Sequence, residues 1–258
     1  MSHSIGRLLG LCLVIVVGLG ALGAARLASV ACGPFARSPC VRVLFLGNSY
    51  TYVNDLPDVL RDLARAGGHA LDTASIAGGG ETLADHAASQ ASVGAIRDSR
   101  WNFVVLQEQS QIPAVESVRQ AQMDPAVRLL VDVIRTAGGT PVLLETWAHR
   151  DGWSDYRLDY RAMQMAIDAG YRTLGADLRA GVAPVGEAWQ TALLQDPALA
   201  LWQDDGSHPS MAGTYLAACV LYASILRESP VGNSDTAGLS PEVAGALQTI
   251  AAVTVGVQ

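Results

Sequence analysis

From residue 41 onward, short apolar runs alternate with longer segments in which apolar residues recur every three or four positions. The short runs predict β-strands that are buried on both faces, as in a parallel sheet. The longer segments predict amphipathic helices. The strands are expected at residues 41–46, 70–76, 103–106, 140–145 and 181–184. The helices are expected at residues 56–66, 82–97, 155–174, 187–194 and 210–226, within 115–137 with a restart at Pro125, and from Ser240 onward.

This order of elements predicts the fold class. Strands that alternate with helices over short connections build a parallel sheet with helices packed on both faces. We therefore expect an α/β protein, a three-layer α/β/α sandwich with a mostly parallel sheet of about five strands. Residues 41–258 are expected to form one domain, because their length suits a single core and they contain no internal repeat or low-complexity linker.

The first residues show a different pattern. Residues 8–25 are apolar or small throughout, and Arg7 and Arg26 flank them. A basic residue followed by such a run is typical of a secretory signal peptide or an N-terminal membrane anchor. The run is close to the roughly 20 residues that span a bilayer, so its length fits either one. We expect residues 1–31 to be this segment and the protein to be exported: secreted, periplasmic or attached to the outer face of the membrane.

Composition narrows the classes of partner. Only 16% of the residues are charged, the net charge is −7, and none of the basic residues is lysine. An acidic chain disfavours a nucleic-acid partner, and one without lysine has neither a Walker-type phosphate loop nor a lysine Schiff base. Cys32 and Cys40 flank a short loop and could form a disulfide in an oxidising compartment. The chain has no Cys-x-x-Cys pair, which gives little support for zinc, and we expect no metal or cofactor.

Chemically capable side chains gather in the segments that follow the predicted strands. In a parallel sheet these segments open on one edge, where ligands bind in α/β folds. Ser49 follows the first strand, and Asp205-x-x-His208 lies in a loop before the last strongly apolar helix. Serine is a weak nucleophile unless a base takes its proton, and a histidine held by a carboxylate is such a base. Asp205-x-x-His208 alone fits an ordinary turn equally well, but together with Ser49 it predicts a catalytic triad.

These motifs resemble those of a known family. Gly-Asn-Ser at residues 47–49, Gly80 after the second strand and Asp205-x-x-His208 near the C-terminus are similar to the sequence blocks of the SGNH, or GDSL-like, hydrolases. The resemblance covers roughly residues 41–226. It implies the flavodoxin-like α/β/α fold of that family, and ester hydrolysis by a triad of Ser49, His208 and Asp205 that uses no metal or cofactor.

The resemblance also implies an oxyanion hole. The backbone N–H groups of Ser49 and Gly80 would donate to the oxyanion, although either of the two preceding glycines could replace Gly80. The family has Gly-x-Asn-Asp after the third strand, whereas this chain has Gln-Glu-Gln-Ser at residues 107–110. Gln109 falls at the position of the asparagine and is the expected third donor. With Asn48 where the family usually has aspartate, the chain resembles a divergent bacterial branch.

The substrate is predicted from the loop at residues 145–153, which contains Trp147, His149 and Trp153. Exposed indole rings with polar neighbours favour contact with sugar rings, and buried indoles that anchor the loop fit the sequence equally well. We expect Trp147, His149 and Asn48 to contact the substrate. That substrate would be a small-molecule or carbohydrate ester, such as an O-acetylated sugar, with a lipid or aryl ester as the alternative.

Other functions are compatible with the same residues. An O-acyltransferase would pass the acyl group from Ser49 to a sugar hydroxyl instead of to water, and sequence does not separate the two reactions. A non-catalytic surface or carbohydrate-binding protein is favoured by the altered third block and disfavoured by the intact triad residues. Nucleotide binding by the glycines at residues 78–80 is disfavoured, because they lack the Gly-x-Gly-x-x-Gly spacing.

Overall fold

The centre of the fold is a sheet of five parallel strands in the order β2-β1-β3-β4-β5. The computed structural model describes Cys32, residues 40–98 and residues 100–258. The strands are β1 (Val41–Gly47), β2 (Leu71–Ala77), β3 (Phe103–Leu106), β4 (Thr140–Leu144) and β5 (Gly181–Ala183). The predicted α/β class is confirmed, and the ends of each strand lie within about one residue of their expected positions.

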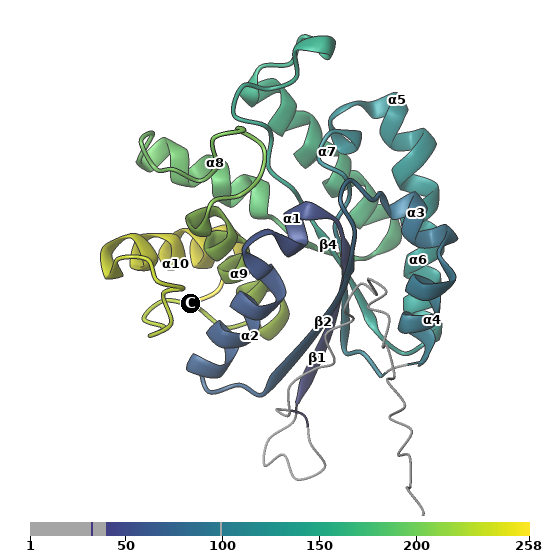
Figure 1. Ribbon diagram of the computed structural model, residues 1–258, viewed down its shortest axis with the longest axis horizontal. Helices are drawn as coiled ribbons and strands as arrows, with labels where there is room; N and C mark the ends of the chain where they lie inside the picture. The colour runs from purple at the N-terminus through teal and green to yellow at the C-terminus, as the bar shows by residue number, and fades with distance from the viewer. Residues whose placement is uncertain (1–31, 33–39, 99) are drawn as a thin grey trace, which may run out of the picture.

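Helices cover both faces of this sheet (Figure 1). One face packs against α2 (Leu56–Ala66), α8 (Val185–Gln195), α9 (Met211–Leu226) and α10 (Pro241–Val255). The other packs against α3 (Leu83–Ala88), α4 (Gln90–Asp98), α6 (Asp124–Thr136) and α7 (Tyr160–Leu178). Side chains alternate between the faces of a strand. In β1, Val43 and Phe45 therefore lie in the first core and Leu44 and Leu46 in the second. For this reason β1 is apolar on both of its faces from Val43 to Leu46.

Three predicted helices differ from those observed. The helix expected at residues 82–97 is interrupted at Ser89, whose extended backbone ends α3 before α4 begins. The helix expected from residue 155 begins at Tyr160, because Asp159 caps it by accepting from the backbone of its first turn. The segment within 115–137 is divided into α5 (Glu116–Val118), the π-helical η4 (Arg119–Met123) and α6, with Pro125 as the second residue of α6. The remaining short elements are α1 (Ser49–Tyr52), η2 (Val53–Asp55), η3 (Ile112–Ala114) and η5 (Ser154–Tyr156).

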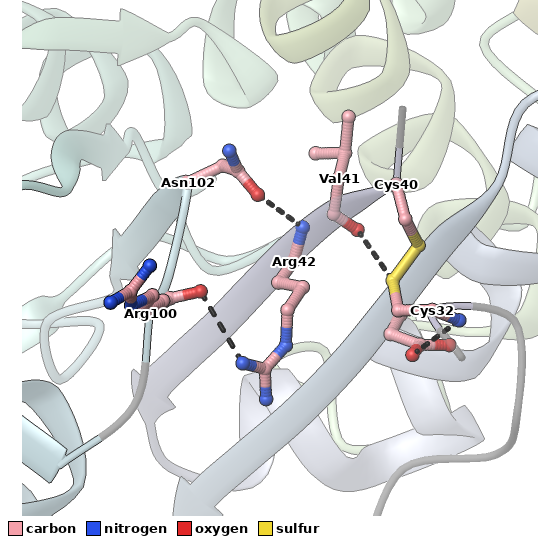
Figure 2. The surroundings of a disulfide bond; sticks show 7 residues. Cys32, Cys40, Val41, Arg42, Arg100 and Asn102 are labelled. Carbon is pink, nitrogen blue, oxygen red and sulfur yellow. Dashed lines mark hydrogen bonds between the residues drawn. A yellow bond between two sulfur atoms is a disulfide. The ribbon is translucent and has the colours of Figure 1, made fainter. Parts of the chain in front are cut away.

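A disulfide between Cys32 and Cys40 fastens the chain at the start of β1 (Figure 2). The two Cα atoms are 5.3 Å apart, and the N–H of Cys32 donates to the carboxylate of Asp72 on β2 at 3.1 Å. The pairing that the sequence left open is therefore present, at the opposite end of β1 from Ser49. Within the part of the chain that the structure describes, every helix is too short or too polar to span a bilayer. The predicted N-terminal segment, residues 1–31, lies outside the described residues.

Candidate active site

The chain turns sharply at the end of β1 and presents Ser49 as the first residue of α1. Gly47 has to be glycine at this turn, because a Cβ there would collide with Oγ1 of Thr51 and with Oε1 of Gln107. The carbonyl of Gly47 accepts a hydrogen bond from the buried His86 at 2.8 Å. The turn is thus held from several sides, and it places Ser49 at the edge where the strand-to-helix loops of a parallel sheet meet.

Asn48 is the N-cap of α1 and is 3% exposed. Its Oδ1 accepts from the backbone N–H of Tyr50 (3.1 Å) and from Nε2 of Gln107 (3.0 Å). Its Nδ2 donates to the carbonyl of Glu81 (2.9 Å). Both polar atoms of the side chain are therefore used inside the protein. The predicted contact of Asn48 with the substrate stays a prediction.

His208 reaches Ser49 from the loop before α9. Its Nε2 lies 2.9 Å from Oγ of Ser49, and its Nδ1 lies 2.5 Å from Oδ2 of Asp205. Desolvation works to raise the pKa of Asp205, but hydrogen bonds from the His208 imidazole and from the N–H groups of Ser207 and His208 outweigh it, and the pKa lies below its usual range. Asp205 is therefore an ionised acceptor that can orient the imidazole. The structure brings these three predicted residues into one hydrogen-bonded chain.

The glycine loop after β2 lies beside the nucleophile. A Cβ on Gly79 would be 3.4 Å from the hydroxyl of Tyr52, which is on α1 with Ser49. The N–H of Gly78 donates to the carboxylate of Glu81 at 2.7 Å, so this glycine is committed to the loop itself. Gly80 has φ +73°, and neither its N–H nor that of Gly79 forms a hydrogen bond within the described residues. Gly79 and Gly80 therefore remain candidates for the predicted backbone donor to the oxyanion, and Gly78 does not.

Gln109, the third expected oxyanion donor, is held in one orientation. Its Oε1 accepts from the backbone N–H groups of Gln111 (2.8 Å) and Ile112 (3.3 Å), which leaves Nε2 as its donor. Its own N–H donates to Oε1 of Glu108 at 2.7 Å, and the same oxygen accepts from the N–H of Leu83 on α3 at 3.1 Å. Burial raises the pKa of Glu108 to about 7. Glu108 thus ties the loops after β2 and β3 together, while the role of Gln109 stays a prediction.

Trp147 lies beneath the site and not on its surface. It is 1% exposed, and its ring stacks between those of Tyr50 (4.5 Å between centroids) and Trp189 (4.2 Å). Its Nε1 donates to the carbonyl of Ser207 at 3.0 Å. Neither face of the indole is free, so the prediction that Trp147 contacts a sugar is wrong. It anchors the loop, which is the alternative that the sequence left open.

His149 is half-buried behind the loop that carries Asp205 and His208. Its Nε2 lies 2.9 Å from Oγ of Ser110 and 3.2 Å from Oγ of Ser207. Desolvation lowers the pKa of His149, so the ring is neutral near pH 7. Its predicted contact with the substrate stays a prediction, since the structure shows only that Nε2 binds protein hydroxyls.

Two other aromatic side chains are exposed in segments that open on the same edge of the sheet. Tyr52 lies on α1, three positions after Ser49, and is 48% exposed. Tyr156 follows β4 on the segment closed by a bridge between Trp153 and Leu158, and it is 47% exposed. Its ring packs against that of Trp153 with the centroids 4.4 Å apart. Tyr52 and Tyr156 are thus exposed aromatic side chains, unlike the buried Trp147.

Sequence reasoning missed the residues that support the site. Gln107 bridges Asn48 and Thr51, and Glu108 bridges two loops. Ser110 and Ser207 bind His149. One signal was present: Gln107, Glu108 and Ser110 are consecutive or nearly consecutive polar residues directly after a buried strand, and such residues must find partners.

The sequence matches no family model and no curated protein. Among solved structures, the chain is similar to a protein of Slackia heliotrinireducens that is assigned to the SGNH hydrolases, with 30% identity and a TM-score of 0.62 over 72% of this chain and 100% of that one. It is also similar to a DUF4886 family protein of Bacteroides uniformis, with 20% identity and a TM-score of 0.73 over 84% and 95% of the two chains. An acetyl xylan esterase shares the fold at 12% identity and a TM-score of 0.59, over 72% of this chain and 100% of that one.

Proposed function

The chain belongs to the SGNH hydrolase superfamily, and we propose that it acts on ester bonds as a serine esterase with Ser49 as its nucleophile. One observation carries this proposal: the hydrogen-bonded chain from Oγ of Ser49 through the imidazole of His208 to the carboxylate of Asp205. A nucleophile, a base and an acid that orients the base are the parts that acyl transfer through a serine requires.

The proposed reaction has two steps. Oγ of Ser49 bonds to the ester carbonyl carbon while Nε2 of His208 takes its proton, and that proton then passes to the departing alcohol. Water attacks the acyl-enzyme, gives its proton to His208 and releases the acid, and Ser49 recovers its proton. The N–H groups of Ser49 and Gly80 and Nε2 of Gln109 are the proposed oxyanion donors, and one such donor typically contributes ~2.7–4 kcal/mol.

We propose an O-acylated carbohydrate, with a short acyl group such as acetyl, as the substrate. The side chains of His208 and Asp205 are 34% and 47% exposed, so a bulky alcohol has access to the triad. The rings of Tyr50, Trp147 and Trp189 stack on one another, starting from the residue next to the nucleophile, and this packing favours a short acyl group. The exposed rings of Tyr52 and Tyr156 would then contact the sugar.

We further propose that the protein is exported, with residues 1–31 as a signal peptide or a membrane anchor. The disulfide between Cys32 and Cys40 supports this, because disulfides persist in oxidising compartments and are rare in the cytosol. Detection of the mature protein outside the cytoplasm, and sequencing of its N-terminus, would test both parts of the proposal.

Labelling with a fluorophosphonate tests the catalytic proposal directly. We expect the wild type to be modified on Ser49, the Ser49→Ala variant to remain unmodified, and Ser229→Ala, which changes a serine beyond α9, to be modified like the wild type. Labelling of a different serine, or no labelling of folded wild type, would contradict it. Hydrolysis of long-chain esters without release of acetate from acetylated sugars would contradict the substrate. If acetate appeared on an added acceptor sugar in place of free acetate, the protein would be an acyltransferase.

A further inference from the structure

The hydroxyl of Ser207 lies between the acid and the base of the proposed triad in sequence, and it contacts two other parts of the site. Its Oγ is 2.7 Å from the hydroxyl of Tyr50, the residue after the nucleophile, and 3.2 Å from Nε2 of His149 in the loop after β4. The same ring nitrogen is 2.9 Å from Oγ of Ser110, in the loop after β3. We call Tyr50, Ser110, His149 and Ser207 the hydroxyl cluster.

The hydroxyl cluster connects four segments that are distant in sequence. Tyr50 belongs to α1, Ser110 and His149 follow β3 and β4, and Ser207 belongs to the loop that carries the acid and the base. Each of these segments contributes part of the site, and the catalytic side chains themselves join α1 to the acid–base loop through the bond between Ser49 and His208. The hydroxyl cluster supplies a second connection beside it.

The side chains of the hydroxyl cluster are uncharged. Burial raises the pKa of Tyr50 to about 12, so its hydroxyl keeps its proton, and either that hydroxyl or the one of Ser207 donates in the bond between them. Desolvation lowers the pKa of His149, so Nε2 of the neutral ring can accept from a serine hydroxyl. The cluster then carries no charge, and it adds no repulsion to the imidazolium that forms on His208 during acyl transfer.

Neighbouring hydrogen bonds hold together the two loops that contribute His149 and Ser207 to the hydroxyl cluster. Next to His149, the N–H of Arg150 donates to the carbonyl of Gly206 at 2.7 Å, and its guanidinium donates to the carbonyl of Asp204 at 3.1 Å. Trp147 donates to the carbonyl of Ser207 at 3.0 Å. The acid–base loop is thus attached through its backbone to the loop after β4, and the Ser207 hydroxyl extends that attachment to the nucleophile's helix.

From these contacts we infer that Ser207 is a positioning residue, whose hydroxyl, through Tyr50 and His149, sets the distance between His208 and the nucleophile. This inference rests on the proposed function, because it assigns a role relative to Ser49 and His208. Small errors in the placement of reacting groups cost up to about 100-fold in rate. The loss of one hydroxyl that acts indirectly should cost about 10-fold, equivalent to ~1.4 kcal/mol.

The test compares Ser207→Ala, Tyr50→Phe and the double variant. Phenylalanine at position 50 keeps the ring that stacks on Trp147 and removes only the hydroxyl. We expect each single variant to lower the maximal rate of Ser49 modification by fluorophosphonate, and kcat for an acetyl ester, about 10-fold with little change in half-saturating concentration. The double variant should be no slower than the slower single variant, since the two hydroxyls act as one unit.

The control is Tyr215→Phe, which removes a buried hydroxyl bonded to the carbonyl of Asp235 and to Gln248, both beyond α9. We expect this variant to lose thermal stability and to keep the wild-type rate. If Ser207→Ala behaved like the control, losing stability without losing maximal rate, the positioning role would be refuted. Tyr50→Phe provides the same decision if Ser207→Ala does not fold. If fluorophosphonate did not modify the wild type, the proposed function and this inference would both be refuted. If fluorophosphonate modified the wild type and the Ser207→Ala variant at the same maximal rate, this inference alone would be refuted.

Discussion

Replacing Asn48 with aspartate, the residue that the resemblance leads one to expect there, should destabilise this protein. In the wild type, Nδ2 of Asn48 donates to the carbonyl of Glu81, while Oδ1 accepts from Tyr50 and Gln107. The substitution keeps Oδ1 and puts a second oxygen where the donor was. An ionised carboxylate would then face a carbonyl oxygen at a position that is 3% exposed.

The size of the effect follows from these contacts. A buried acceptor that loses its donor costs about 1–3 kcal/mol. The new carboxyl group can avoid this loss by binding a proton and donating it to the carbonyl of Glu81, so its pKa in the folded protein should rise above the unfolded value of about 3.9. A raised folded pKa means that the folded state loses stability as pH rises from the unfolded pKa through the folded one. The variant should therefore be close to wild type at low pH, and the full loss should appear above the raised pKa.

Urea unfolding monitored by tryptophan fluorescence at pH 4, close to the unfolded pKa, and at pH 8 would measure this difference. The control is Asn102→Asp, because the exposed side chain of Asn102 bonds, among the described residues, only through Oδ1, which accepts from the N–H of Arg42 at 2.8 Å (Figure 2). Aspartate retains that acceptor, so we expect a change within about 0.5 kcal/mol. The explanation would be refuted if Asn48→Asp matched the wild type at pH 8, or lost the same free energy of unfolding at both pH values.

Two further predictions concern the loop after β3 and the buried carboxyl group at the end of β4. Gln109→Ala should lower kcat about 100- to 1,000-fold with little change in KM, as the loss of an oxyanion donor does; an unchanged kcat in steady-state assays would remove Gln109 from the oxyanion hole. Burial, and the nearby carboxylate of Asp168, raise the pKa of Glu145 to about 9, so the wild type should lose stability as pH rises from about 4.3 toward 9. Glu145→Gln keeps the acceptor for the N–H of Glu187 and should weaken that dependence, which denaturant midpoints at pH 6 and pH 9 would show; an equally steep dependence in the variant would contradict it.

The elements set by local pattern were predictable from the sequence. The strands other than β2 are mainly apolar runs bounded by polar or turn residues. The helix α2 matches its expected range because its apolar residues keep one helical face. Ser49, His208 and Asp205 could be selected because few residue types can act as nucleophile, base and orienting acid. The structure brings these three side chains into contact although most of the chain separates Ser49 from the other two.

The surroundings of Trp147 and Asn48 could not be predicted, because they depend on contacts between segments that are distant in sequence. Trp147 is buried because Tyr50 and Trp189 cover its two faces, and nothing in the neighbouring sequence indicates either partner. Asn48 is engaged by Gln107 and Glu81 from two other loops, and its neighbours in sequence indicate neither partner. The helix boundaries that differ from the predicted ones are set by individual backbone angles and helix caps, which the spacing of apolar residues does not reveal.

The placement of the Cys32–Cys40 disulfide has a consequence for how the protein would sit on a surface. It holds residue 32 beside Asp72, near the start of β2, whereas Ser49 and His208 lie at the other end of the sheet. A tether that ran from residue 32 toward a bilayer would leave the domain on the side away from the catalytic edge. An esterase held in this way would have its triad facing away from the bilayer, toward polymers in its surroundings, and not toward the lipids of its own membrane.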